Sequence, residues 1–230
     1  MKRKGTKGTN RYSNTLLLIL LVSGIVTILI VILTVGIRKC LFPDAVPVVN
    51  NTRVIQNVDA EMDALGVQKF FLTRNKNSRP GTALTQVKGV VVHYTANPGT
   101  DAKENRNYFE SRKNCPDKSA YKVSSHYIIG LKGNIIQCIP ENEIAYASNK
   151  RNIDTISIEC CHPDTTGKFN EKTYQSLVRL VSILCKKYQL ETTQIIRHYD
   201  VTQKLCPKYF VENPDKWKKF KNDVQKQIIE

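Results

Sequence analysis

An uncharged apolar run near the amino terminus constrains the fold of this chain more than any other feature. It extends from Leu16 to Ile37 and reads LLLILLVSGIVTILIVILTVGI, which is 22 residues without a charge. An α-helix of that length spans roughly 33 Å, enough to cross the hydrocarbon core of a bilayer. The run therefore predicts one amino-terminal transmembrane signal-anchor helix over residues 16–37.

The charges beside this run predict its orientation. Residues 1–15 contain five basic residues and no acidic one. Excess Lys and Arg on one flank favours keeping that flank in the cytoplasm, so we expect a cytoplasmic basic tail over residues 1–15. The chain would then lie in the cell membrane with a single pass and its remainder outside. A cleaved secretory signal is the alternative, but its apolar region normally has about 7–15 residues. Either interpretation exports the rest of the chain.

The charge of the exported part limits its partners. The formal net charge of the chain is +15, and +8 remains for residues 41–230 once the seven basic residues before Cys40 are set aside. A basic exported domain is attracted to anionic polymers. The sequence has no basic stripe interleaved with aromatic residues, so we expect no nucleic-acid partner. The seven cysteines are an odd number, which does not suit a framework built only of disulfides.

The exported part divides into a spacer and one domain. Residues 38–59 contain prolines and polar clusters without periodicity and predict a spacer, and residues 60–230 have the length of an ordinary single domain. Apolar β-branched runs alternate with segments of helical periodicity, which predicts an α/β fold with a single central β-sheet and helices packed against it. The predicted strands are 87–95, 154–160 and 193–198 with a hairpin around 131–133, and the predicted helices are 102–113, 170–188 and one starting near Pro214.

An imidazole, an ammonium group and a thiol lie close together in the segment IIRHYDVTQKLCPKYF. They are His198, Lys204 and Cys206. A catalytic zinc site typically takes three protein ligands and leaves a fourth position open. His198 and Cys206 could supply two ligands, and His93 is the best candidate for the third because a predicted strand ends there. His126 lies inside a predicted strand and His162 precedes Pro163 in a loop, so a structural role is favoured for both. Cys206 could instead form a disulfide with Cys138 or Cys115.

Four segments, VVVHYTAN, SSHYIIG, DTISIECC and RHYDVTQKLCP, resemble in this order the motifs of zinc-dependent N-acetylmuramoyl-L-alanine amidases of the type 2 family. That family includes phage lysis amidases and peptidoglycan recognition proteins. The resemblance covers residues 87–217 and is closest to clostridial and bacillus-like cell-wall amidases. It implies a mixed sheet flanked by helices, one Zn²⁺ per catalytic domain, and hydrolysis of the amide between N-acetylmuramic acid and L-alanine in peptidoglycan. The catalytic domain, residues 60–230, would then face the cell wall.

The resemblance also implies residue roles. His93, His198 and Cys206 match the metal ligands, while Lys204 and Glu159 match catalytic positions. Ser125 stands where some phage members have a catalytic tyrosine, so general-base work is assigned to Glu159. A carboxylate there could accept a proton from water and pass it to the leaving amine, and the Lys204 ammonium could stabilise the developing oxyanion.

Two further points remain open in the sequence. Six residues near the ends of the motifs could line a sugar–peptide groove or serve only as surface and turn residues: Tyr94, Thr95, Asn97, Asn149, Arg151 and Asn152.

The alternative functions are a non-catalytic peptidoglycan-binding module tethered to the membrane and a tethered protein with a structural zinc. A structural zinc usually has four protein ligands, whereas the sequence nominates three.

Overall fold

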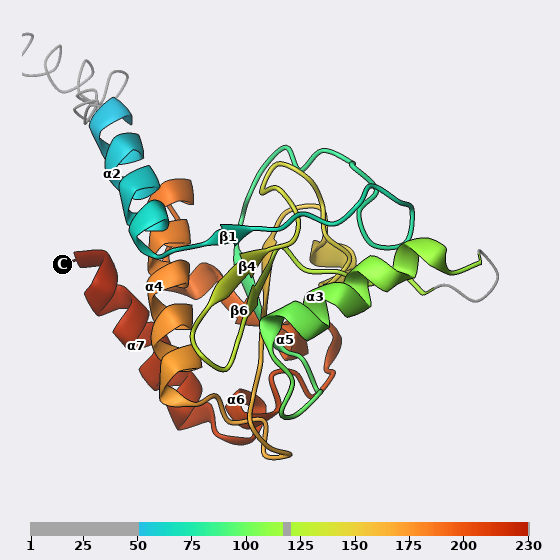
Figure 1. Ribbon diagram of the computed structural model, residues 1–230. Helices are drawn as coiled ribbons and strands as arrows, with labels where there is room; N and C mark the ends of the chain where they lie inside the picture. Colours follow the sequence, from blue (N-terminus) through green and yellow to red (C-terminus); the bar gives the residue numbers. More distant parts are fainter. Residues whose placement is uncertain (1–50, 117–120, 230) are drawn as a thin grey trace, which may run out of the picture. The chain divides into compact units, whose positions relative to one another are not determined.

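The computed structural model describes residues 51–116 and 121–229, with side chains from residue 57 onward. A six-stranded sheet lies at its centre, in the order β1-β4-β3-β5-β2-β6. The strands are β1 (Gln68–Lys69), β2 (Val90–Tyr94), β3 (Tyr127–Ile129), β4 (Ile135–Gln137), β5 (Ile156–Cys160) and β6 (Ile195–Arg197). The main helices are α2 (Asn51–Ala64), α3 (Ala102–Ser111), α4 (Glu171–Tyr188), α5 (His198–Thr202), α6 (Lys208–Glu212) and α7 (Pro214–Ile229) (Figure 1).

The sheet is mixed, as the family resemblance implied. The pairs β3–β5, β5–β2 and β2–β6 are parallel, whereas β4 pairs with β3 as an antiparallel hairpin. The hairpin is the one predicted around Gly133. β1 extends the sheet through a short parallel pairing with β4. The parallel strands β2, β5 and β6 end at one edge of the sheet, and this edge carries the candidate site.

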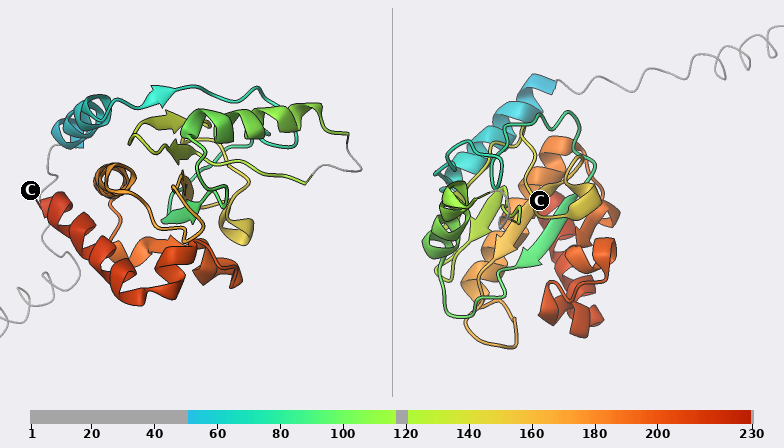
Figure 2. Two further views of the ribbon diagram at one scale, coloured as in Figure 1. Left: turned by 60° about the horizontal axis from the view of Figure 1, so that its bottom comes forward. Right: turned by 90° about the vertical axis from the view of Figure 1, so that its right-hand side faces the viewer.

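Successive side chains of a strand point to opposite faces of the sheet, so the apolar residues of the strands form two layers. Val90 and Val92 on β2 face the same layer as Leu177 of α4 and Phe220 of α7. Ile128 of β3 belongs to the opposite layer, and its neighbours there include Ala102 and Phe109 of α3. Figure 2 shows α3 on one side of the strands and α4 with α7 on the other. Helices therefore cover both faces, as parallel strands require.

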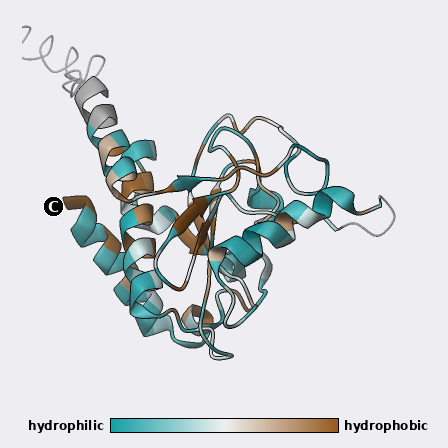
Figure 3. Ribbon diagram, viewed as in Figure 1, coloured by the Kyte–Doolittle hydropathy of each residue, from teal (hydrophilic) through white to brown (hydrophobic). Residues whose placement is uncertain are grey.

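Helix α4 illustrates why the sequence folds in this way. Asn170 caps its amino terminus by accepting a hydrogen bond from the Thr173 backbone N–H (2.9 Å). Leu177, Val181 and Leu184 follow one another on the buried face, at the three- and four-residue spacing of an amphipathic helix. Figure 3 shows apolar residues concentrated on the central strands, with polar residues prevailing along α3.

The structure contradicts the predicted location in the membrane. Within residues 51–116 and 121–229, no helix has both the length and the apolar character needed to cross a bilayer. The longest of these helices, α4, has charged residues on its exposed face, including Lys172 and Arg179, and it covers a sheet. The predicted tail and anchor, residues 1–15 and 16–37, lie outside the described residues.

The predicted spacer also needs correction. Residues 51–59 of that spacer are helical and belong to α2, which continues to Ala64. Val58 of α2 is buried and Met62, one turn later, packs against the large apolar layer. This i, i+4 pair is a helical signal, although the prolines before it dominate the composition of the segment.

Candidate metal centre

Three potential metal ligands meet where strands β2 and β6 end. His93 is the penultimate residue of β2, and His198 follows the last residue of β6 directly. Because β2 and β6 are parallel neighbours, their carboxyl ends present both imidazoles at one edge. Helix α5 then turns the chain back, and the Tyr199 N–H donates to the Cys206 carbonyl (2.8 Å). This return brings the Cys206 thiol to the histidines.

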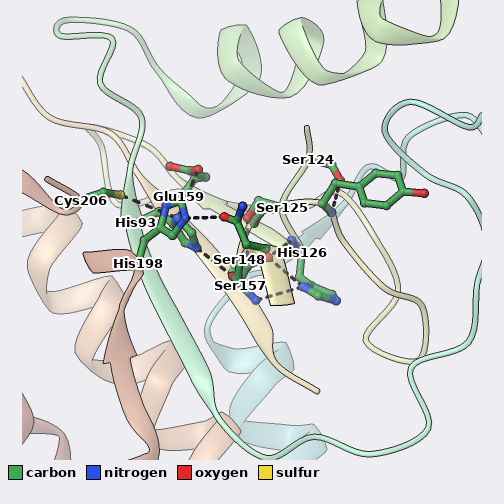
Figure 4. A network of polar contacts seen from close by, with 12 residues as sticks. His93, Ser124, Ser125, His126, Ser148, Ser157, Glu159, His198 and Cys206 are labelled. Atoms are coloured by element: carbon green, nitrogen blue, oxygen red, sulfur yellow. Dashed lines mark hydrogen bonds and ion pairs between the residues drawn. The ribbon is translucent and has the colours of Figure 1, made fainter. Parts of the chain in front are cut away.

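The donor atoms are close enough to share one ion. His93 Nδ1 lies 3.8 Å from Cys206 Sγ, and the His93 and His198 ring centroids are 4.6 Å apart. One donor atom from each of the three residues lies within 4.8 Å of the others, and Figure 4 shows the three side chains close together. All three are buried. Tetrahedral zinc with N and S ligands would hold its donors about 3.3–3.6 Å apart. A set of two imidazoles and one thiol therefore fits such a metal in its chemistry, and its donor atoms lie somewhat farther apart than a bound ion would hold them.

The protonation states of these groups act on metal binding in opposite directions. Burial, together with His198 and Lys204, holds the pKa of His93 well below its ordinary value, so its imidazole is neutral and can act as a ligand. Burial also raises the pKa of Cys206 to about 12, and the nearby Glu159 adds to the rise. A cation at this position would stabilise the thiolate that the protein alone disfavours.

Glu159 lies beside the ligand group. It pairs in register with His93 across β5 and β2, and its Oε1 is 4.0 Å from His93 Nδ1. Burial raises its pKa to about 8, and the positive charge of Lys204 opposes that rise. Glu159 Oε2 is buried without a hydrogen-bond partner although the residue lines the cleft. A buried carboxyl oxygen without a partner is costly unless a water molecule or a substrate supplies a hydrogen bond.

Two side chains from one loop contact the histidines. Ser148 Oγ lies 3.2 Å from His93 Nε2, and His198 Nε2 donates to Asn149 Oδ1 at 3.0 Å. The sequence indicated Asn149 as a groove residue but gave Ser148 no role. The polar cluster ASNKRN that contains both residues was the available signal, although its length and composition are also those of an ordinary loop.

The ligand group opens into a cleft of about 780 Å³. Five of the six predicted groove residues line it, together with exposed Lys204: Tyr94, Thr95, Asn97, Asn149 and Asn152. Arg151 does not line it, because its Nε donates to Asp154 (2.7 Å) beside the loop. The sequence did not predict the aromatic part of the wall, which includes Tyr108, Tyr121 and Tyr146. These tyrosines come from separate segments and show no pattern along the chain.

The other histidines and Ser125 have structural partners. His126 Nδ1 accepts from the Ser157 N–H (3.0 Å), and His126 Nε2 donates to the Glu143 carbonyl (2.9 Å). His162 Nδ1 lies 2.7 Å from the Asp164 carbonyl. The Ser125 hydroxyl is buried and donates to backbone carbonyls. Ser125 therefore does not line the cleft and does not replace the catalytic tyrosine of some phage members.

The disulfide alternative for Cys206 is not observed. Cys206, Cys138 and Cys115 are all free, as are the three other cysteines of the described ranges, Cys160, Cys161 and Cys185. Among the residues that the structure describes, the candidate metal group contains three members and no fourth histidine or cysteine. This composition favours a site with an open position over a closed structural site.

Comparison with known proteins gives consistent results. The family described as N-acetylmuramoyl-L-alanine amidase matches residues 83–209. The N-acetylmuramoyl-L-alanine amidase CwlL of Bacillus licheniformis is 37% identical over 170 residues, which is 69% of this chain and 46% of that protein. The N-acetylmuramoyl-L-alanine amidase BlyA of Bacillus subtilis is 33% identical over 179 residues, which is 69% of this chain and 46% of that protein. This chain therefore spans about half the length of the curated relatives it matches. The solved catalytic domain of XlyA is similar in fold, with a TM-score of 0.57, 26% identity, and coverage of 69% of this chain and 98% of that one.

Proposed function

This chain belongs to the N-acetylmuramoyl-L-alanine amidase family, and we propose that it hydrolyses the amide between N-acetylmuramic acid and L-alanine in peptidoglycan. One observation carries this proposal: two imidazoles and a thiol converge beside a buried carboxyl group at the floor of an open cleft. We assign the catalytic domain to residues 60–230, and the basic character of the chain suits an anionic wall polymer.

In this proposal His93, His198 and Cys206 hold a zinc ion. Their donor set and burial suit zinc better than calcium or magnesium, which prefer oxygen ligands. When bound, zinc supplies Lewis acidity toward the substrate carbonyl and increases the acidity of water. The three ligands would therefore place this acidity at the edge of the sheet where the cleft opens.

Glu159 and Lys204 provide the remaining chemistry in this proposal. The Glu159 carboxylate accepts a proton from the attacking water and delivers it to the leaving amine. Its position on a strand within 4.0 Å of His93 fixes it close to the reacting groups. The Lys204 ammonium, at the cleft, stabilises the negative charge that develops on the amide oxygen. The five groove residues that line the cleft, Tyr94, Thr95, Asn97, Asn149 and Asn152, would contact the glycan and the peptide.

Two substitutions test the proposal. Glu159→Gln removes the proton acceptor but preserves the shape of the side chain, so we expect the variant to retain zinc and to lose hydrolysis of purified cell wall. His198→Ala removes a ligand, so we expect loss of both zinc and hydrolysis. Glu171→Gln, at an exposed position on α4, is the matched control and should behave as wild type.

The measurements are the zinc content of purified protein and the release of sugar-free stem peptides from walls. Wild-type hydrolysis by either site variant would refute the assignment of that residue. Binding of walls by the wild-type protein without release of peptides would instead identify a non-catalytic recognition module.

A further inference from the structure

A single loop, residues 146–152, contacts both candidate histidine ligands. Its first residue is fixed to the segment before β3 by two hydrogen bonds, because the Ser124 N–H donates to the Tyr146 carbonyl (3.0 Å) and the Tyr146 N–H donates to Ser124 Oγ (2.9 Å). Asn152, the last residue of the loop, is hydrogen-bonded to its beginning. Its Oδ1 accepts from the N–H groups of Ala147 (3.0 Å) and Ser148 (2.6 Å).

The two contacts with the histidines differ in kind, because Asn149 Oδ1 can only accept a hydrogen bond, whereas the Ser148 hydroxyl can donate or accept one. Ser148 Oγ lies 3.2 Å from Nε2 of His93, and Asn149 Oδ1 accepts from Nε2 of His198 at 3.0 Å. On each ring the Nε2 atom is therefore engaged by the loop. In His93 the remaining nitrogen, Nδ1, faces Cys206 Sγ at 3.8 Å. In Figure 4, Ser148 lies beside the two imidazoles, with Cys206 on their other side.

We propose that loop 146–152 is a positioning element that places the proton on Nε2 of both His93 and His198 and leaves Nδ1 of each free for the metal. The proposal rests on the proposed function, because it assumes a metal at this site. A neutral imidazole carries its proton on one nitrogen, and the hydrogen bond made by that nitrogen selects the tautomer and the ring orientation. Ser148 and Asn149 would thus act on the metal through the histidines, without contacting it.

The backbone of the loop supports this role. Asn149 has φ of 51°, a left-handed conformation that asparagine tolerates better than most residues and that glycine adopts without strain. The conformation places two successive side chains, Ser148 and Asn149, on two different rings. Asn152 stabilises this conformation, because its carboxamide oxygen accepts from the backbone N–H groups of Ala147 and Ser148.

The left-handed conformation also allows a clean experiment. Asn149→Gly retains the backbone preference and removes the acceptor, whereas Asn149→Asp retains an acceptor oxygen. Ser148→Ala and Ser148→Thr form a second pair of the same design. Ser176→Ala is the matched control, because it removes a hydroxyl that donates to the Gly133 carbonyl (2.7 Å) and has no contact with a histidine.

We would measure the zinc affinity of the full chain by competition with a chelating dye. We would also record the imidazole ¹⁵N spectra of the metal-free protein, which report the proton position on each of its four histidines. Asn149→Gly and Ser148→Ala should each weaken zinc binding by about 10- to 100-fold and add the Nδ1–H tautomer of His198 and His93, respectively. Asn149→Asp should bind zinc no more weakly than wild type, because a carboxylate also accepts from the imidazole and raises its basicity. Ser148→Thr and Ser176→Ala should remain within about threefold of wild type.

Wild-type zinc affinity and wild-type ring spectra in both Asn149→Gly and Ser148→Ala would overturn the inference. If the wild-type protein binds zinc and hydrolyses cell wall under the same conditions, that result leaves the proposed function intact. Failure of the wild-type protein itself to bind zinc would overturn the proposed function and this inference together.

Discussion

His93 and Glu159 occupy paired positions on the neighbouring parallel strands β2 and β5, with Nδ1 of the imidazole 4.0 Å from Oε1 of the carboxyl group. Side chains at paired positions stand on the same face of a sheet. The hydrogen-bonded ladder between the strands therefore fixes the separation between a proposed metal ligand and the proposed general base. A loop would not hold two such groups with the same precision.

We expect Glu159→Asp to lower the hydrolysis rate by about 100-fold, because shortening the side chain by one methylene group moves the carboxylate away from the reacting groups. The charge is preserved and no ligand is lost, so zinc content should equal that of wild type. The measurement is the initial rate of stem-peptide release from purified walls. Glu171→Asp on the exposed face of α4 controls for the shortening. An undiminished rate in Glu159→Asp would show that the carboxylate position is not critical.

Lys204 lines the cleft and is exposed. Removing one donor that stabilises an oxyanion typically costs about 100- to 1,000-fold in kcat, and we expect a loss of this size for Lys204→Ala. Lys204→Arg should recover part of the rate, because it restores the positive charge. Steady-state kinetics on soluble muropeptides would measure both values, with Lys172→Ala on α4 as a surface control. A change confined to KM would assign Lys204 to substrate binding instead.

Chelation should abolish hydrolysis and lower the thermal stability of the protein. A ligand that binds only the folded state at about 1,000 times its Kd adds about 4 kcal/mol to the free energy of unfolding. Zinc should therefore raise Tm in wild type, while His198→Ala should show no such rise. Scanning calorimetry with and without added zinc measures the effect. Equal Tm values for metal-free and zinc-treated wild type would argue against a bound metal in the folded protein.

Glu110 should make folding sensitive to acid. Its carboxylate accepts from Thr73 Oγ1 (2.6 Å) and from Lys113 Nζ (2.8 Å), and it lies 3.1 Å from Arg106 Nη2. Despite the opposing effect of burial, these partners lower its pKa from 4.5 to about 2. A lowered folded-state pKa gives stability that is complete above the unfolded-state value and is lost as pH falls toward the folded-state value.

Glu110→Gln should therefore reduce the free energy of unfolding at pH 7, by about 1 kcal/mol for a partly exposed group. The difference from wild type should shrink as pH falls from about 4.5 to about 2. Urea unfolding at a series of pH values measures it, and Glu104→Gln in the capping box of the same helix provides a comparison. A difference that stays constant across this range would exclude the ionisation of Glu110 as its cause.

Local patterns in the sequence determined much of the fold. The apolar stripe and the Asn170 cap predicted α4, and the β-branched run ending at His93 predicted β2. The hairpin around Gly133 was evident from a short glycine-containing loop between two apolar runs. These features depend on residues close together in the chain, so side-chain periodicity and turn chemistry suffice to identify them. The same patterns did not identify the helical end of the predicted spacer.

The tertiary structure decided which side chains meet. His93 and Cys206 are separated by 113 positions in the chain, and only the parallel pairing of β2 with β6 and the return of the chain after α5 bring their donor atoms together. The contacts of Ser148 and Asn149 with the two imidazoles, and the ion pair that draws Arg151 toward Asp154, depend on the path of one irregular loop. Such contacts join residues with no periodic relationship. Residue type identified the candidates, and the packing of the sheet edge selected among them.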